Sequence, residues 1–100
     1  MEHEKVVESF AELGNPHRLS VFRLLVKAGP EGATVGVIQD ALKIPGSTLS
    51  HHLTRMTRVE LITQERVSRT IVCKLNFPHL GGLIQFLQDE CCQGIEDGPA

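Results

Sequence analysis

The spacing of apolar residues changes partway along this chain, and that change constrains the fold more than any other feature. Up to residue 58 apolar side chains recur every three or four positions, as on one face of a helix. The segments 61–65 and 70–75 are short and rich in Ile, Val and Thr, which predicts two strands of a β-hairpin joined through residues 66–69. Helical spacing returns after Pro78. The chain is therefore predicted to be mainly α with one small β-hairpin.

Helix caps and helix breakers divide the helical part of the chain into short segments. Asn15 and Pro16 suit the N-cap and first position of a helix, and Thr34 can cap another. We expect helices at 3–13, from Pro16 to about Ala28, from Thr34 through Leu42, at 47–58, and from Pro78 to a stop at Gly94. Pro45 and Gly46 place a tight turn between the third and fourth helices, as in a helix-turn-helix unit. With the hairpin, this order predicts an α+β winged helix-turn-helix with flanking N- and C-terminal helices.

The length of the chain, 100 residues, is that of one small domain. We assign residues 1–94 to this domain and expect residues 95–100, with two acids, Gly and Pro, to form a disordered tail. A domain of this size is marginally stable alone. The flanking helices carry more large apolar side chains than one core can cover, namely Val6, Phe10, Leu13, Leu83, Ile84 and Leu87. The sequence therefore predicts a homodimer that pairs through its first and last helices.

Charge is distributed unevenly along the chain. The formal net charge is −2, which by itself argues against a nucleic-acid partner. Residues 43–74, however, hold six basic side chains against two acidic ones, a net +4, so the remainder of the chain carries −6. This division concentrates positive potential on the helix-turn-helix and hairpin, which is typical of a surface that faces phosphates.

The fourth helix has one apolar and one polar face. At 100° per residue, Leu49, Leu53 and Met56 fall on one side and are expected to face the core. The opposite side is polar and basic without a carboxylate, as duplex DNA requires of a helix in its major groove. We expect DNA contacts from Ser47, Thr48, Ser50, His51, Thr54, Arg55 and Arg58 of this helix, and from Arg66 and Arg69 of the hairpin. His52 lies nearer the apolar side and is expected to be a partly buried packing residue.

Two segments of this chain resemble the ArsR/SmtB family of bacterial repressors. One reads Leu-Gly-Asn-Pro-His-Arg-Leu at 13–19, and the other runs from Ser47 to Met56 and is followed by Val-Glu-Leu-Ile at 59–62. The resemblance spans residues 5–92, and it departs from the family at Val59-Glu60, where Ala-Gly is usual, and in the wing, which lacks a common glycine. It implies a homodimeric repressor that binds double-stranded operator DNA and is released by an inducer.

Inducer sites of this family lie at several places in the chain, and one of them has a counterpart here. Three kinds of inducer site found in the family are absent here. The first places Cys-X-Cys at positions that read Val-Gly-Val at 35–37, and the second needs a cysteine in the second helix, which has none. The third needs several metal ligands on the last helix, where His79 stands alone. The pair Cys91-Cys92 resembles the site of an arsenic-responsive branch, which implies a trivalent arsenical, organic or inorganic, or antimonite as inducer, and no required cofactor. Alternatively, Cys91 continues the apolar stripe as a small hydrophobe. Cys73 is expected to pack in the hairpin core, although it or solvent oxygen could supply a third ligand.

Other classes of protein receive little support from the sequence. Three cysteines, two of them adjacent, do not form a disulfide framework of the secreted type. The chain has no long apolar run and no signal-like start, so we expect a cytoplasmic protein without a membrane partner. No Ser/His/Asp set, paired carboxylates or glycine-rich phosphate loop predicts an enzyme. Two alternatives remain open: a redox sensor that uses the same thiols, and a protein-interaction winged helix that does not bind DNA.

Overall fold

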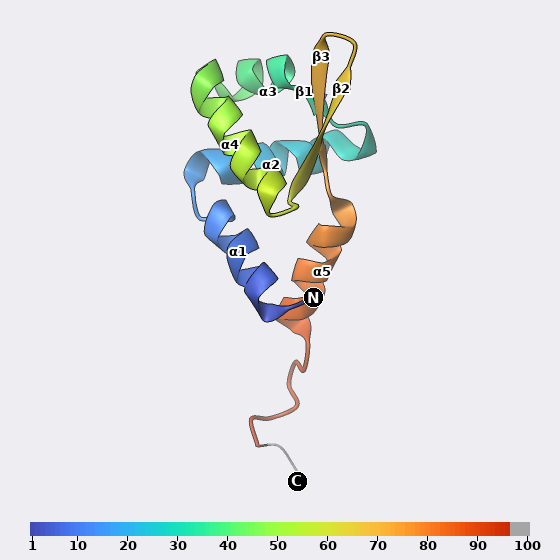
Figure 1. Cartoon of the computed structure of the whole chain (residues 1–100). Helices are drawn as coiled ribbons and strands as arrows, with labels where there is room; N and C mark the ends of the chain where they lie inside the picture. The colour runs from blue at the N-terminus through green and yellow to red at the C-terminus, as the bar shows by residue number, and fades with distance from the viewer. Residues whose placement is uncertain (97–100) are drawn as a thin grey trace.

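The computed structural model describes residues 1–96 and forms a winged helix-turn-helix with a helix at each end of the chain. The elements are α1 (His3–Leu13), α2 (Pro16–Ala28), the 3-10 turn η1 (Gly29–Glu31), β1 (Ala33–Thr34), α3 (Val35–Leu42), α4 (Gly46–Arg58), β2 (Ile62–Val67), β3 (Thr70–Leu75) and α5 (Phe77–Gln88). Figure 1 shows α3, α4 and the hairpin at one end of the molecule, and α1 and α5 converging at the other. The predicted fold class is therefore confirmed.

Side-chain caps start the helices where the sequence indicates. Asn15 Oδ1 accepts hydrogen bonds from the backbone N–H groups of His17 and Arg18, at 2.9 and 3.1 Å, and Pro16 occupies the first turn. Thr34 Oγ1 accepts from the N–H of Val37 at 3.1 Å. Each cap satisfies donors that the first turn of a helix leaves without a partner, and this fixes the helix start.

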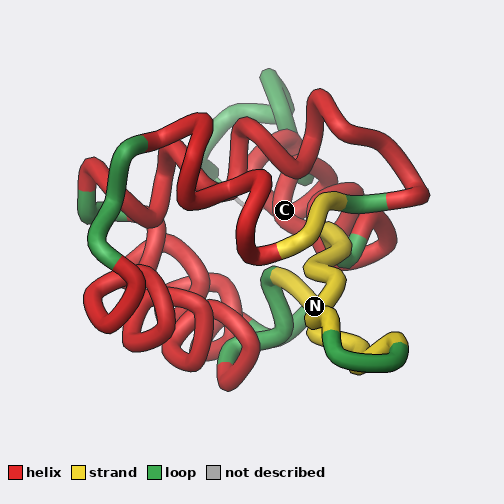
Figure 2. The backbone as a smooth tube through the Cα atoms, turned by 90° about the horizontal axis from the view of Figure 1, so that it is seen from above, coloured by secondary structure: helices red, strands yellow, loops and turns green. Residues whose placement is uncertain are grey.

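The β-sheet has three antiparallel strands in the order β1-β3-β2, one strand more than the predicted hairpin. The added strand, β1, is two residues long and pairs Ala33 with Cys73 of β3. Strand β2 also continues to Val67, so the predicted four-residue connection is a two-residue turn. Ser68 takes a positive φ of 59° in that turn. Figure 2 shows the hairpin at the edge of the helical body. Its turn and the neighbouring strand residues 63–70 are exposed, whereas Ile62, Cys73 and Leu75 are buried.

The hydrophobic core lies between α2, α3, α4 and the sheet. Leu49, Leu53 and Met56 are buried, which confirms the predicted inner face of α4, and Cys73 is buried as predicted. The other buried apolar residues are Val6, Val21, Phe22, Leu25, Ile38, Ile44, Leu61, Ile62, Leu75 and Leu83. Val6 and Leu83 therefore belong to the core of the protomer itself, and they do not add to the surplus apolar surface from which the dimer was predicted.

Helix α5 begins one residue earlier and ends sooner than the sequence predicts. It is capped by Asn76, whose side chain accepts from the N–H of His79, and its last residue is Gln88, not a residue near Gly94. Asp89 leaves the helical conformation, with φ −55° and ψ 139°. Within residues 1–96 the apolar stripe beyond Leu83 stays exposed, with Leu87 at 66%, so packing does not favour a further turn.

Residues 89–96, which follow α5, are exposed. Ile95 has no packing partner, while residues 97–100 of the predicted tail lie outside the described residues. None of the helices in residues 1–96 combines the length and the apolar character that crossing a membrane would need.

Candidate nucleic-acid interface and cysteine pair

Helix α4 presents its polar face to solvent. The exposed side chains are those predicted for this face, namely Ser47, Thr48, Ser50, His51, Thr54 and Arg58. The helix contains no carboxylate, and both of its arginines lie in the last turn. Hydroxyl, imidazole and guanidinium groups can reach base edges and phosphates, and no acidic group on this helix repels them.

His52 anchors the inner side of α4 to α2. It is 7% exposed, which confirms the predicted packing role. Arg18 Nη1 donates a hydrogen bond of 3.1 Å to His52 Nδ1. Because a guanidinium has no acceptor, Nδ1 must be the unprotonated nitrogen of the ring. Burial, and secondly the charge of Arg18, lower the pKa of His52, so the ring stays neutral.

Arg55 takes part in an ion pair that sequence reasoning missed. Its Nε donates to Glu12 Oε1 at 2.8 Å and its Nη2 donates to Oε2 at 3.3 Å. Arg18 Nε lies 3.2 Å from the same carboxylate and donates to the Glu12 carbonyl. The Arg55 hydrogen bonds and the nearby positive charges outweigh burial and lower the pKa of Glu12. No helical or strand spacing connects positions 12 and 55, which lie 43 residues apart, so only the packing of α1 on α4 reveals the pair.

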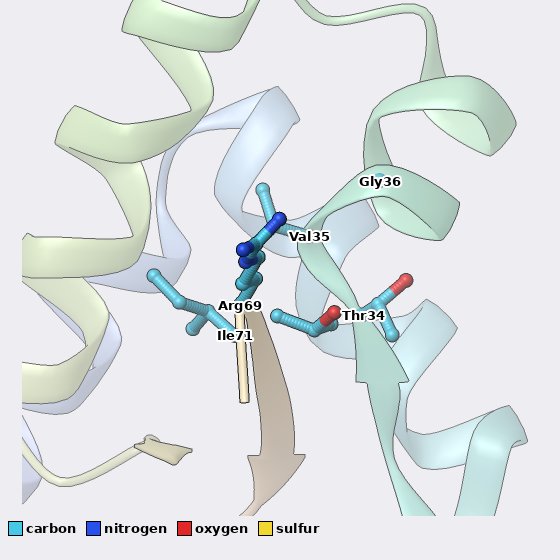
Figure 3. A pocket seen from close by; sticks show the side chains of 6 residues that line it. Thr34, Val35, Gly36, Arg69 and Ile71 are labelled. Carbon is cyan, nitrogen blue, oxygen red and sulfur yellow. The ribbon is translucent and has the colours of Figure 1, made fainter. Parts of the chain in front are cut away.

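The wing places two exposed arginines beside the helix-turn-helix. Arg66 is on β2, and Arg69 is in the turn that follows it. Arg69 and Thr70 line a shallow hollow of about 410 Å³ with Ile71 and the first residues of α3. Figure 3 shows the Arg69 guanidinium extended toward Val35 at the start of α3. A guanidinium and a helix N-terminus both carry positive charge or partial positive charge, so the lining of this hollow is positively polarised.

The cysteine pair lies in the turn that follows α5, not within the helix as predicted. Cys91 and Cys92 are exposed, with Sγ atoms 2.9 Å apart, and Cys92 has a φ of 67°. The hydrogen bond between the Cys91 thiol and Cys92, and secondly desolvation, raise the pKa of Cys91. Burial raises the pKa of Cys73 to about 11. Within residues 1–96 no three His, Cys, Asp or Glu side chains come together as metal ligands, so Cys73 does not complete a three-ligand site with the pair.

Comparisons with known proteins agree with this geometry. Residues 13–65 match the helix-turn-helix domain family. The uncharacterized HTH-type transcriptional regulator YbzH of Bacillus subtilis is 34% identical over 84% of this chain and 96% of its own length. The uncharacterized HTH-type transcriptional regulator MJ1325 of Methanocaldococcus jannaschii is 36% identical over 61% of this chain. The match covers 66% of MJ1325, slightly less than two thirds of its length.

Solved structures show the same architecture. The transcriptional repressor PagR of Bacillus anthracis superposes with a TM-score of 0.68 at 31% identity, over 84% of this chain and 93% of PagR. The ArsR family regulator RHA00566 superposes with a TM-score of 0.73 at 20% identity, over 87% of each chain. These relatives are regulators and not enzymes. The chain belongs to the helix-turn-helix transcriptional regulators and has the winged fold of the ArsR family.

Proposed function

We propose that this protein is a homodimeric repressor that binds operator DNA with α4 in the major groove. The observation that carries the proposal is the exposed face of α4, which is polar, basic and without a carboxylate. Base edges are read by residues toward its N-terminus, namely Ser47, Thr48, Ser50, His51 and Thr54. Phosphates are contacted by Arg55 and Arg58 in its last turn. Arg66 and Arg69 of the wing bind the backbone beside the groove.

The dimer forms through α1 and α5. Val7 is 53% exposed, Phe10 38%, Ile84 48% and Leu87 66%, so each helix exposes two large apolar side chains. A second copy of the chain covers these residues with its own, because a two-fold interface pairs the same surface on both protomers. Two recognition helices then engage half-sites about 34–36 Å apart.

The inducer is a trivalent arsenical bound by Cys91 and Cys92. Their Sγ atoms are exposed and 2.9 Å apart, close enough for one thiophilic centre to bind both sulfurs. Inorganic arsenite prefers three sulfurs, and within residues 1–96 no third ligand joins the pair. An arsenical that already carries one carbon group needs only two, so organic trivalent arsenicals are the preferred inducers, ahead of arsenite and antimonite.

The raised pKa of Cys91 favours arsenical binding over peroxide sensing at this residue. A peroxide sensor needs a low pKa, because the thiolate is the nucleophile that peroxide oxidises. The hydrogen bond between the two cysteines raises the pKa of Cys91 instead. In arsenical binding each thiol proton leaves as water with a hydroxyl of the arsenical while an As–S bond replaces the As–O bond, and this exchange tolerates a raised thiol pKa. The site follows α5, so an occupied pair alters the dimer angle and the spacing of the two α4 helices.

The test is release of a labelled DNA duplex. A binding duplex is first selected from a random pool with the parent protein, and the complex is then titrated with phenylarsenite, arsenite, antimonite and hydrogen peroxide. We expect release by phenylarsenite at the lowest concentration and no release from Cys91→Ser or Cys92→Ser, with Cys73→Ser as the matched control. Release that persists in both variants, or no release by any trivalent arsenical, refutes the cysteine site. Failure to select any duplex refutes DNA binding.

A further inference from the structure

We propose that Glu12 is a positioning residue that holds the Arg55 guanidinium in the orientation that binds a DNA phosphate. The inference deepens the proposed function and rests on it. Glu12 belongs to α1, an element outside the helix-turn-helix, yet its carboxylate contacts the recognition helix directly. The DNA-binding surface therefore includes a residue of the helix assigned to the dimer.

The atoms that Arg55 uses for Glu12 leave its outer end free. A guanidinium has five N–H donors, and Nε and Nη2 each give one to the carboxylate along the side of the group. The remaining N–H groups on Nη1 and Nη2 form the end of the fork. That end can donate two parallel hydrogen bonds to phosphate oxygens, which is the geometry in which arginine binds phosphate most strongly. The Arg55 side chain is 43% exposed, and within residues 1–96 Glu12 is its one hydrogen-bond partner.

The charge of the cluster also favours a bound phosphate. Glu12 is shared by two guanidiniums, because Arg18 Nε lies 3.2 Å from the Oε1 atom that accepts from Arg55. Arg18 is nearly buried, with its side chain 11% exposed. The three side chains together carry a net charge of +1, so the pair with Glu12 does not cancel the attraction of Arg55 for a phosphate.

The position of Arg55 along α4 points to a phosphate and not to a base. Helices of this kind read bases with their N-terminal residues. Arg55 follows Ser47 by eight residues, or about 12 Å along the helix axis. An orienting partner lowers the cost of binding, because an immobilised arginine has already lost rotamer freedom. Without Glu12 the Arg55 side chain keeps its charge but loses its fixed direction.

The experiment is a double-mutant cycle in DNA binding, measured on the selected duplex and on a random duplex of the same length. The variants are Glu12→Gln, Arg55→Ala and the double variant, and Glu8→Gln is the control because Glu8 is an exposed acid one turn away on α1. Arg55→Ala is expected to weaken binding about ten-fold and to make the salt slope shallower by about 1.8, since each dimer loses two phosphate contacts. Glu12→Gln is expected to weaken binding about three- to ten-fold, equally on both duplexes.

The double variant decides between positioning and folding. If Glu12 acts through Arg55, Glu12→Gln causes no further loss in the Arg55→Ala background. DNA binding by Arg55→Lys is the second measurement. This variant keeps the positive charge but cannot form the two-point pair with Glu12, so it is expected to bind as weakly as Glu12→Gln. Adding Glu12→Gln to Arg55→Lys is expected to cause no further loss. Thermal unfolding of each variant checks the fold.

Four results would overturn the inference. Unchanged DNA binding by Glu12→Gln means that Glu12 does not position Arg55 for a phosphate, and tighter binding means that Glu12 holds Arg55 away from DNA. Losses that multiply in the double variant mean that Glu12 acts through the fold. If Arg55→Ala binds like the parent while Arg58→Ala binds weakly, the inference is wrong and the proposed function stands. If neither arginine variant changes binding, both are wrong.

Discussion

The two ends of this molecule are stabilised in different ways. At the end formed by α3, α4 and the sheet, Ile38, Leu49 and Met56 are completely buried. At the end formed by α1 and α5, Val6 and Leu83 are buried, but large apolar side chains on both helices remain 38–66% exposed. Figure 1 shows that α1 and α5 extend away from the core with few elements around them. We call the first end the reading end and the second the unfinished end. The reading end also exposes Val37 and Val67, at 55% and 51%, but it contains most of the buried core, whereas the unfinished end is the one that a second copy covers in the dimer proposed above.

The largest effect on DNA affinity should come from a charge placed among the exposed apolar side chains of α1 and α5, at the unfinished end. Phe10→Asp places a carboxylate where a second copy covers apolar surface, and an unpaired charge is costly to bury. We expect a monomer at micromolar concentration in sedimentation, and operator affinity lower by about 100-fold or more because the second half-site is no longer bound within the same complex.

Val67→Asp is the matched control for dimer formation, because Val67 is 51% exposed on the wing at the opposite end of the molecule. It should sediment like the parent. A dimeric Phe10→Asp protein would show that α1 does not form the interface.

Truncation of a leucine should have a large effect on stability in the buried core and a small one on the exposed face of α5. Leu25 is completely buried, so Leu25→Ala should lower the free energy of unfolding by about 2–5 kcal/mol. Leu87 is 66% exposed, so Leu87→Ala should change that free energy by less than about 0.5 kcal/mol in the monomeric Phe10→Asp background, and should act on the dimer dissociation constant instead. Urea denaturation of both variants in that background measures the contrast. Equal losses at the two positions would contradict it.

The reading end could be predicted closely from the sequence because its signals are local. Asn15, Pro16 and Thr34 mark helix starts by their own chemistry, and the spacing of Leu49, Leu53 and Met56 identifies the inner face of α4. The missed strand β1 has only two residues, too few for an alternating pattern.

The other end was predicted less well because its structure depends on contacts that spacing does not encode. The apolar stripe of α5 continues in the sequence to Cys91, but the helix stops at Gln88, where the preceding stripe residue Leu87 is 66% exposed among the described residues 1–96. Similarly, the predicted face of α4 includes Arg55, but the pair with Glu12 depends on how α1 crosses α4. The positions of Cys91 and Cys92 could be named, whereas their conformation could not.

Each end contains one buried histidine, and both should make the protein less stable in acid. His52 accepts from Arg18 at the reading end, and His79 Nε2 shares a 2.7 Å hydrogen bond with Ser9 Oγ between α1 and α5. Burial lowers the pKa of both histidines. At His79 the effect of burial is larger than that of Glu60, whose negative charge raises the pKa, and the positive charge of Lys5 lowers the pKa further. The unfolded chain therefore binds more protons than the folded one below pH 6.5, the ordinary histidine pKa.

This stability is present above pH 6.5 and is lost as the pH falls below it. We expect the free energy of unfolding from urea denaturation to decrease between pH 7.5 and 5.5. His52→Gln and His79→Gln should each flatten the decrease. If the slope is unchanged in the double variant, these two histidines do not cause the acid sensitivity.

The smallest effect should be a gain of stability at the unfinished end that leaves the reading end untouched. Gly81 is exposed inside α5, and a Cβ atom there would meet nothing within 4 Å. Because glycine is a poor helix former, Gly81→Ala should raise the free energy of unfolding by about 0.5–1 kcal/mol. At Gly82 an added Cβ would lie 2.5 Å from Met1 Cε, so Gly82→Ala must displace that side chain and should gain less. Urea denaturation measures both gains, and DNA affinity should be the same for both variants. If Gly81→Ala instead loses stability, and the loss grows as the protein is diluted, the partner's backbone lies against this glycine. The centre of the dimer interface would then be on α5.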